Sequence, residues 1–254
     1  MKPLRIIIAG FIIAAMNTLP ASPLYSEAGA AESVYPVSAS TSLSIKVAVL
    51  DSGSNTAYKE GISLIDSTPG DHNGHGTLMA RIIEEVYPGA ELYIVKVIGD
   101  NGLALNEKAV ILGLEWAISR DVDIINISLR LKGSSELYQA IREAYRKGIV
   151  IVAAAGNRRT NKAGVRYATD TVAYPARYDE VIAVGALDRS GKVYSGSIEG
   201  DEVTLRIRGY RGNRAGTSIA SAYAAGLAAK IMSENQDKDI HEIKNILIRA
   251  AQGR

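Results

Sequence analysis

The sequence of 254 residues contains no cysteine, so the protein can form no disulfide bond and its fold depends on its apolar core. It also lacks a strong charge of either sign: 29 basic and 27 acidic residues give a formal net charge of +2, and no basic run stands out. This balance argues against a dedicated nucleic-acid-binding protein. No segment repeats at the periods typical of solenoids and propellers, which argues against those architectures.

The sequence has no apolar run near its amino terminus that could cross a bilayer, for which ~20 residues are needed. The run from Ile6 to Met16 has eleven residues, and Lys2 and Arg5 precede it. Such a run behind positive charges is typical of a secretory signal, and Ala28-Gly29-Ala30 supplies an A-x-A cleavage site. We therefore expect a signal peptide over residues 1–30 and a secreted protein with no stable membrane anchor after cleavage. A buried amino-terminal strand is the alternative.

Small and polar residues, among them Pro36 and many serines, occupy positions 31–44 and indicate a linker or a short pro-segment. From residue 45 to residue 254, short runs rich in valine and isoleucine alternate with helical patterns, which indicates one α/β domain. The expected helices follow His75, Thr217 and Asp239 and cover 106–120 and 135–147. The expected strands are Ile45–Leu50, Leu92–Ile98, Ile124–Leu129, Ile149–Ala154 and Val181–Leu187.

Each expected strand is almost continuously apolar, as is typical of strands that are covered on both faces. The alternation of strands and helices therefore predicts a three-layer α/β fold, with a mainly parallel sheet and helices on both of its faces. Right-handed crossovers bring the carboxyl ends of such strands to one edge of the sheet. That edge is where binding and catalytic sites form in open α/β sheets.

Four polar residues fall at or near this edge. Asp51 closes the first strand in VAVLDSG, Asn157 follows the fourth strand in IVIVAAAGN, and Ser218 opens a helix in GTSIAS. His75 stands at the start of another helix in DHNGHGT, between two glycines. Taken singly, each has an ordinary structural interpretation, because Asp and Asn are common turn residues and Thr217 or Ser218 could cap its helix.

A metal site is a weaker interpretation. His72 and His75 are three residues apart, but His241 is the only other histidine, and zinc needs at least a third ligand. Taken together, the four residues instead supply a hydroxyl, a base, a carboxylate that orients the base and an amide that can donate to an oxyanion. These are the groups that nucleophilic acyl transfer requires.

At these residues the chain resembles the subtilisin-like serine proteases, the subtilases. The order Asp, His, Ser along the chain is the order of the subtilisin triad, and three motifs in order are more specific than one. The resemblance implies a subtilisin-like fold and a serine endopeptidase that acts on polypeptide substrates. It extends from about residue 45 to residue 231, through the stretches VAVLDSG, DHNGHGT, INISL, AAAGN, YPARYDEVIAVGA and GTSIAS.

The resemblance also assigns roles to single residues. It implies that Ser218 is the nucleophile, His75 the general base and Asp51 the carboxylate that orients the base. Asn157 and the backbone N–H of Ser218 would donate to the oxyanion, and Ser221, one turn further into the helix, is expected to pack. The implied substrate-binding residues are Gly102, Leu103, Ser128, Leu129, Arg130, Ala154, Ala155, Gly156 and Ala173.

The chain departs from the family pattern at several positions. Arg130 replaces the usual glycine after the SL pair, and Ala173 replaces a glycine at the bottom of the primary pocket. Leu78 and Arg81 change the stretch after the histidine. No departure removes a catalytic group, so they bear on substrate preference and rate more than on reaction type. From Arg130, Lys132 and Ala173 we predict small or medium apolar residues before the scissile bond and a tolerance for acidic residues further upstream.

Many subtilases hold a calcium ion in a loop inserted after the helix of the histidine. Here the helix from Gly76 runs through Val86 and meets Tyr87-Pro88-Gly89, with no Asn/Asp-rich insertion. Calcium takes about six to eight oxygen ligands, which this short connection does not supply. We therefore predict no calcium at this position and no other cofactor.

Three other functions fit the sequence less well. A non-catalytic relative that binds peptides in the same groove should have lost at least one of the four site residues, and all four are present. An α/β-hydrolase lipase or esterase needs a G-x-S-x-G elbow and the order Ser, acid, His, and neither occurs. A dinucleotide-binding domain needs G-x-G-x-x-G after the first strand, which is also absent.

Overall fold

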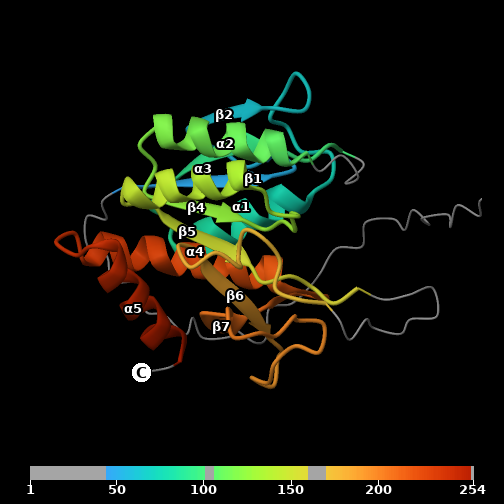
Figure 1. Ribbon diagram of the computed structural model, residues 1–254, viewed down its shortest axis with the longest axis vertical. Helices are drawn as coiled ribbons and strands as arrows, with labels where there is room; N and C mark the ends of the chain where they lie inside the picture. The colour runs from blue at the N-terminus through green and yellow to red at the C-terminus, as the bar shows by residue number, and fades with distance from the viewer. Residues whose placement is uncertain (1–43, 101–105, 160–169, 253–254) are drawn as a thin grey trace, which may run out of the picture. The chain divides into compact units, whose positions relative to one another are not determined.

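The computed structural model describes residues 44–100, 106–159 and 170–252 (Figure 1). Within these ranges, seven strands form one sheet in the order β2-β3-β1-β4-β5-β6-β7, and all neighbouring strands are parallel. A short antiparallel hairpin, β8 with β9, stands apart from the sheet. The strands are β1 (Ile45–Asp51), β2 (Glu60–Ser63), β3 (Ala90–Lys96), β4 (Ile124–Ile127), β5 (Val150–Ala154), β6 (Ile182–Leu187), β7 (Leu205–Arg208), β8 (Tyr210–Arg211) and β9 (Arg214–Ala215).

Helices cover both faces of the sheet, as predicted. Helices α2 and α3 pack against each other and against strands β1, β3 and β5, whereas α4 packs against α1, α5 and the strands from β4 to β7 (Figure 1). The helices are α1 (His75–Val86), α2 (Glu107–Ser119), α3 (Ser135–Arg146), α4 (Thr217–Glu234) and α5 (Ile240–Ala251).

Alternate side chains of the central strand, β1, point to the two opposite faces of the sheet. Ala48 and Leu50 of β1 belong to the apolar core that lies under α2 and α3. Val47 and Val49 are equally buried, and successive side chains of a strand point to opposite faces. Both faces of the sheet are therefore apolar, which is why the sequence of this strand reads as a continuous run rather than an alternating one.

The alanine-rich helix α4 is buried along most of its length. Its small side chains let it approach its neighbours closely: a Cβ on Gly226 would lie only 2.7 Å from the Cβ of Val86 in α1. Packing thus explains the alanines of α4, although it does not explain the Gly216-Thr217-Ser218 sequence at its start. None of the helices in the described part of the chain is long and apolar enough to cross a membrane.

The observed elements lie close to the predicted ones, and the largest differences are two residues at the ends of strands: β3 begins at Ala90, two residues before the predicted start. Strand β3 ends at Lys96 and β4 at Ile127, each two residues before the predicted end. The chain leaves the ladder there because the following residues turn into the loops that build the site. Strands β2 and β7 and the β8–β9 hairpin were not predicted, and the hairpin lies directly before α4.

Candidate active site

The carboxylate of Asp51 and the imidazole of His75 meet at the carboxyl edge of the sheet. Asp51 ends β1 with its side chain 1% exposed, and His75 begins α1 with its side chain 36% exposed. Nδ1 of His75 lies 2.8 Å from Oδ1 and 3.0 Å from Oδ2 of Asp51. Because a carboxylate only accepts hydrogen bonds, this contact favours a proton on Nδ1 and leaves the lone pair of Nε2 able to accept one.

Helix α1 can begin against the end of β1 because a glycine follows His75. A Cβ on Gly76 would lie 2.2 Å from the carbonyl oxygen of Gly53 and 3.1 Å from the Cβ of Asp51. The N–H of Gly76 also donates to Oγ of Ser52 at 2.9 Å, which ties the helix start to the residue after β1. A larger residue at position 76 would therefore push α1, and His75 with it, away from Asp51.

A second buried carboxylate, that of Asp71, holds the turn before α1. Its Oδ1 accepts from the N–H of Gly74 at 2.8 Å and from Oγ of Ser52 at 3.0 Å. Its Oδ2 accepts from the N–H and the hydroxyl of Thr77 at 2.8 and 2.6 Å. Burial would raise the pKa of Asp71, but these hydrogen bonds outweigh it and hold the pKa below its ordinary value. Asp71 thus fixes the turn that presents His75.

Asp71 was not among the residues predicted from the sequence. Its one signal there is an acidic residue four positions before the histidine of DHNGHGT, which resembles any turn-forming aspartate. The contacts that distinguish it run to Ser52 and Thr77, which lie on different segments, and they exist only in the folded chain.

Electrostatics raise the pKa of His75 above the ordinary 6.5 of a histidine. The main cause is attraction between the imidazolium and the Asp51 carboxylate, which the more distant charge of Asp71 reinforces. Burial and the positive charge of Arg214 act in the opposite direction. His75 is thus neutral, and able to accept a proton, at pH values above this raised pKa.

Ser218 lies in the first turn of α4. The backbone of Gly216 forms the N-cap and no side chain caps the helix, so the interpretation of Thr217 or Ser218 as an N-cap is wrong. The Ser218 hydroxyl donates to the carbonyl oxygen of Ser128 at 3.4 Å, directly after β4. Because β4 pairs with β1, this contact brings Ser218 to the same sheet edge as Asp51.

The start of α4 orients the amide of Asn157. Its Oδ1 accepts from the backbone N–H of Thr217 at 3.0 Å and lies 3.3 Å from the Thr217 hydroxyl. Because Oδ1 of Asn157 accepts from the start of the helix, Nδ2 of the same amide remains able to donate a hydrogen bond. The N–H of Ser218 belongs to the first turn and has no partner inside the helix. Two donors thus stand at a helix N-terminus, where the helix dipole favours negative charge.

Ser221 is engaged in the core, as expected. It is fully buried, and its Oγ donates to Oδ1 of Asn126 in β4 at 2.7 Å. Nδ2 of Asn126 in turn donates to Oγ of Ser128 at 3.2 Å. This series of hydrogen bonds fixes Ser128, the residue that the Ser218 hydroxyl contacts.

The geometry and the family comparison agree. Residues 42–254 match the family model described as the subtilase family. The chain belongs to the subtilase family. Subtilisin DY of Bacillus licheniformis is 35% identical over 82% of this chain and 83% of its own length. A thermostable alkaline protease of Halalkalibacterium halodurans is 38% identical over 81% of this chain and 62% of its own length, so this chain spans less than two thirds of that relative.

Solved structures of subtilases share the fold. The crystal structure of a cold-adapted subtilisin-like serine proteinase superposes with a TM-score of 0.67 and 25% identity, over 80% of each chain. The predicted three-layer subtilisin-like fold is therefore confirmed. Together with the family match and subtilisin DY, this similarity identifies the chain as a serine-type endopeptidase.

In this subtilase, several residues predicted to bind substrate lie together after β5. Ala154 ends the strand, and the N–H of Ala173 donates to the carbonyl oxygen of Ala155 at 3.0 Å. A Cβ on Gly156 would lie 3.5 Å from the Cβ of Ala173. The structure thus joins two segments that are far apart in sequence. Leu129, which follows β4 with Ser128, is buried, and Gly102 and Leu103 lie outside the described residues.

The guanidinium group of Arg130 lies beside the same segments. Its Nη2 lies 3.3 Å from the carbonyl oxygen of Asn157, and a Cβ on Gly156 would lie 3.1 Å from that nitrogen. Its Nη1 lies 3.9 Å from Oδ1 of the buried Asp170, which Arg159 contacts more closely, at 2.8 Å. Asp170 is shared between two guanidinium groups, so it neutralises Arg130 only in part.

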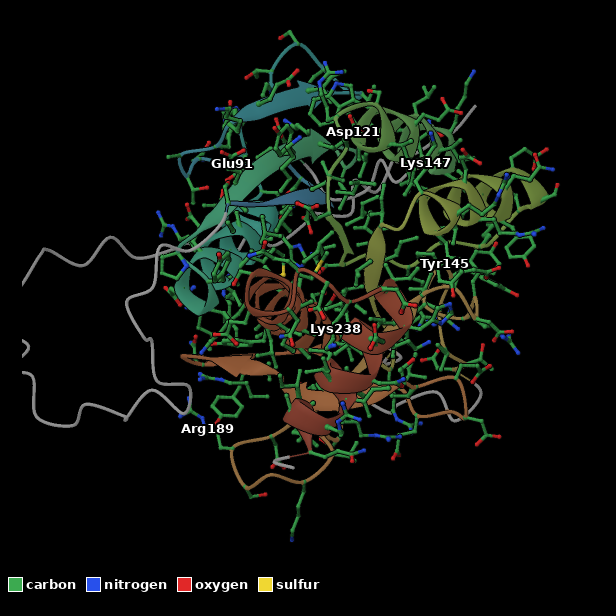
Figure 2. The ribbon with its side chains drawn as sticks, turned by 90° about the vertical axis from the view of Figure 1, so that its left-hand side faces the viewer. Glu91, Asp121, Tyr145, Lys147, Arg189 and Lys238 are labelled. Atoms are coloured by element: carbon green, nitrogen blue, oxygen red, sulfur yellow. The ribbon has the colours of Figure 1, made fainter. Side chains whose placement is uncertain are left out.

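The histidines do not form a metal site in the part of the chain that the structure describes, where no three His, Cys, Asp or Glu side chains gather as ligands. His241 instead contacts the hydroxyl of Tyr145, which Figure 2 labels, at 3.1 Å from Nε2. Helix α1 ends at Val86 and β3 begins at Ala90, so the connection between them has the short length that underlies the calcium prediction.

Proposed function

We propose that this subtilase hydrolyses peptide bonds through an acyl-enzyme on Ser218, with His75 as the general base. Asp51 orients the base, and Asn157 donates to the oxyanion. The observation that carries the proposal is the contact of His75 Nδ1 with both oxygens of the Asp51 carboxylate, at 2.8 and 3.0 Å. This contact leaves Nε2 to accept a proton, and a half-exposed imidazole at a sheet edge is open to a substrate.

In the first half of the reaction, the Ser218 hydroxyl turns from the Ser128 carbonyl toward Nε2 of His75. His75 takes its proton as the oxygen attacks the substrate carbonyl carbon, and Asp51 stabilises the imidazolium that forms. The imidazolium then gives the proton to the leaving amine, and the acyl group remains on Ser218. In the second half, His75 deprotonates a water molecule that hydrolyses the ester.

The developing negative charge on the substrate carbonyl oxygen would be held by Nδ2 of Asn157 and by the N–H of Ser218. The hydrogen bond from Thr217 to Oδ1 of Asn157 supports this role, because it orients the amide before substrate binds. Donors that are fixed in advance need no reorganisation during the reaction, and the loss of one reduces kcat by roughly 10²–10³-fold.

For the acyl side of the substrate we propose two contact surfaces. The backbone at Ser128 and Leu129 would pair with the substrate strand, and the family resemblance implies a second contact from Gly102 and Leu103. The walls of the primary pocket would come from Arg130 and from Ala154, Ala155 and Gly156, with Ala173 at its bottom. A methyl group in place of a hydrogen at position 173 makes the pocket shallower, which favours small or medium apolar side chains.

Secretion is also part of the proposal. The positively charged start and the apolar run of residues 1–30 support a signal peptide, and the A-x-A site at Ala28-Gly29-Ala30 supports its removal. Expression of the full chain in a secreting host, followed by amino-terminal analysis of the protein in the medium, tests this. Protein that stays in the cells with residue 1 intact would contradict it.

Covalent labelling tests the catalytic assignment. The full chain is treated with a serine-directed fluorophosphonate, and the modified residue is located by peptide mass analysis. We expect one label on Ser218, and no label once His75 is replaced by alanine, because the base activates the hydroxyl. A label on any other serine, or the absence of a label from a protein that folds and binds peptides, would identify a different nucleophile or a non-catalytic relative.

A further inference from the structure

A basic cavity of about 570 Å³ lies between the start of α1 and the β8–β9 hairpin. Three arginines line it: Arg81 from α1, and Arg211 and Arg214 from the hairpin. Gly74, the residue directly before His75, lines it as well. The cavity therefore adjoins the proposed catalytic site, yet none of its arginines belongs to the residues predicted to bind substrate.

The positive charge of this cavity is balanced only in part. Arg211 forms an ion pair with Glu85 through Nη2, while its Nη1 is buried and has no hydrogen-bond partner among the described residues. Arg81 and Arg214 are exposed, and neither forms an ion pair with a described residue. A buried donor without a partner in the protein is rare in folded proteins, and an acceptor atom of a ligand in this cavity can satisfy it, as a water molecule can.

Cation–π contacts hold the wall of the cavity in place. Arg189, labelled in Figure 2, lies 5.1 Å from the centre of the Tyr210 ring and donates to the carbonyl oxygen of Gly212. Arg208 lies 5.1 Å from the same ring and 4.4 Å from the ring of Tyr223. These contacts fix the hairpin and add two further cations beside it, so the basic surface exists before any ligand binds.

The position of the cavity indicates which side of the scissile bond it would contact. The acyl side of the substrate belongs with Ser128, whereas the leaving amine must reach His75 to receive its proton. Attraction by Asp51 is the main influence on the pKa of His75, and the charge of Arg214 acts to lower that pKa. Arg214 also lines the same cavity as Gly74, the residue directly before His75, so the cavity lies on the side of the site where the leaving amine departs.

We propose that this basic cavity is a subsite for a carboxylate on the leaving-group side of the substrate, so that the enzyme prefers an acidic residue in the first two positions after the scissile bond. The inference rests on the proposed function and names a substrate class for it. Guanidinium groups bind carboxylates through paired hydrogen bonds, and a cavity of this size accommodates one or two side chains.

Matched peptides test the proposal. Fluorogenic peptides with an identical acyl side carry Glu, Gln, Asp or Asn at the first or second position after the scissile bond, each with an amidated or a free carboxyl terminus. We expect kcat/KM for Glu to exceed that for Gln by ~10-fold at low ionic strength, and the ratio to fall toward 1 at ~1 M salt. A preference that follows only the free terminus would assign the cavity to a terminal carboxylate instead.

Three variants locate the effect. Arg214→Gln and Arg211→Gln should each reduce the Glu/Gln ratio of kcat/KM to ~2-fold or less. Lys147→Gln, which removes the same charge at the end of α3, should keep the full ratio. Thermal unfolding of each variant shows that it folds. An equal Glu/Gln ratio in wild type and Arg214→Gln would overturn the proposal.

A binding measurement separates this proposal from the catalytic one. In the Ser218→Ala protein, fluorescence anisotropy should show the Glu peptide binding ~10-fold more tightly than the Gln peptide, and Arg214→Gln should remove the difference. Ser218-dependent cleavage without this discrimination refutes the subsite but not the proposed function. Tighter binding of the Glu peptide by a protein that cleaves neither peptide refutes the proposed function but not the subsite.

Discussion

Ser128 and Ser218 exchange hydrogen bonds: Oγ of Ser128 donates to the carbonyl oxygen of Ser218 at 3.3 Å, and Oγ of Ser218 donates to that of Ser128 at 3.4 Å. The hydroxyl proposed as the nucleophile is therefore directed to β4 rather than to His75 in this structure. Both hydrogen bonds are long, and the one made by Ser218 is weak enough to be broken by a rotation about a single side-chain bond. Catalytic hydrogen bonds often tighten only when substrate is bound.

The first prediction separates the two serines of α4. Ser218→Ala should abolish fluorophosphonate labelling and reduce kcat by ~10⁶-fold, the magnitude known for the triad serine of subtilisin itself. Ser221→Ala should remain labelled but lose about 1–2 kcal/mol of stability, because Oδ1 of the buried Asn126 loses its donor. Peptide mass analysis and urea unfolding measure the two effects. A label carried by Ser221 would reverse the assignment.

The second prediction concerns pH. Attraction by Asp51 raises the pKa of His75, so kcat/KM should fall as the pH drops through a value above the ordinary 6.5. The charge of Arg214 lowers this pKa, so Arg214→Gln should move the acid limb of the profile to higher pH. Lys147→Gln serves as the control and should leave the limb unchanged. A profile that stays flat down to pH ~4 would rule out His75 as the base.

The third prediction concerns the acyl side of the substrate. Arg130 and the exposed Lys132 line a second cavity, of about 660 Å³, together with Glu107. Acidic residues upstream of the scissile bond should therefore be tolerated, and small or medium apolar residues should be preferred directly before it. Profiling with a peptide library should show the acidic preference weaken in Arg130→Gly and a wider choice before the bond in Ala173→Gly. Unchanged profiles would mean that the side chains of Arg130 and Lys132 point into solvent without contacting the substrate, and that Ala173 does not limit the primary pocket.

The fourth prediction concerns calcium. The connection from Val86 to Ala90 is too short to wrap an ion, so calcium should not stabilise the protein at this position. Thermal unfolding of the Ser218→Ala protein, with chelator or with millimolar calcium, measures this without self-digestion. A site of micromolar affinity would add ~4 kcal/mol at a thousandfold excess of ligand and raise Tm by ~8 °C or more. A rise of that size, with the ion found beside α1, would contradict the prediction.

The fifth prediction concerns Lys96, which is fully buried at the end of β3. Its Nζ lies 2.7 Å from carboxylate oxygens of both Asp66 and Asp100 and donates to the carbonyl oxygen of Gly70 at 3.0 Å. Lys96→Met keeps the apolar stem but leaves the two carboxylates without their cation. We expect a loss of about 2–3 kcal/mol, or ~4–12 °C in Tm, whereas Lys59→Met at an exposed position should change little.

The same cluster gives a pH dependence. The hydrogen bond from Lys96 lowers the pKa of Asp66 from 3.8 to about 2. A carboxyl whose pKa is lowered by folding stabilises the native state above its unfolded pKa, and this contribution is lost as the pH falls through the folded value. Wild-type protein should therefore lose stability between pH ~4 and ~2, and Lys96→Met should lose less over that range. If the urea midpoints of the two proteins fell by the same amount over this pH range, Lys96 would not be the cause of the lowered pKa of Asp66.

The local patterns of the sequence determined most of the fold. Strands β1, β4, β5 and β6 are covered on both faces, so each appears as a continuous apolar run, and helices α2 and α3 begin and end within one residue of their predicted limits. The strands that were not predicted lie at the margins of the sheet. Half-buried β2 and the alternating Leu-Arg-Ile-Arg of β7 bury only part of their side chains, so neither appears in the sequence as a continuous apolar run.

The sequence by itself also determined which residues form the candidate site, because three short motifs in a fixed order carry that information locally. The tertiary structure alone decided how these groups are directed: the Asn157 amide by Thr217, the Ser218 hydroxyl by Ser128, and the turn before His75 by Asp71. It also gathered Arg81 and the hairpin arginines around one cavity. Each of these arrangements depends on contacts between segments that are distant in sequence, and such contacts arise only when the helices pack on the sheet.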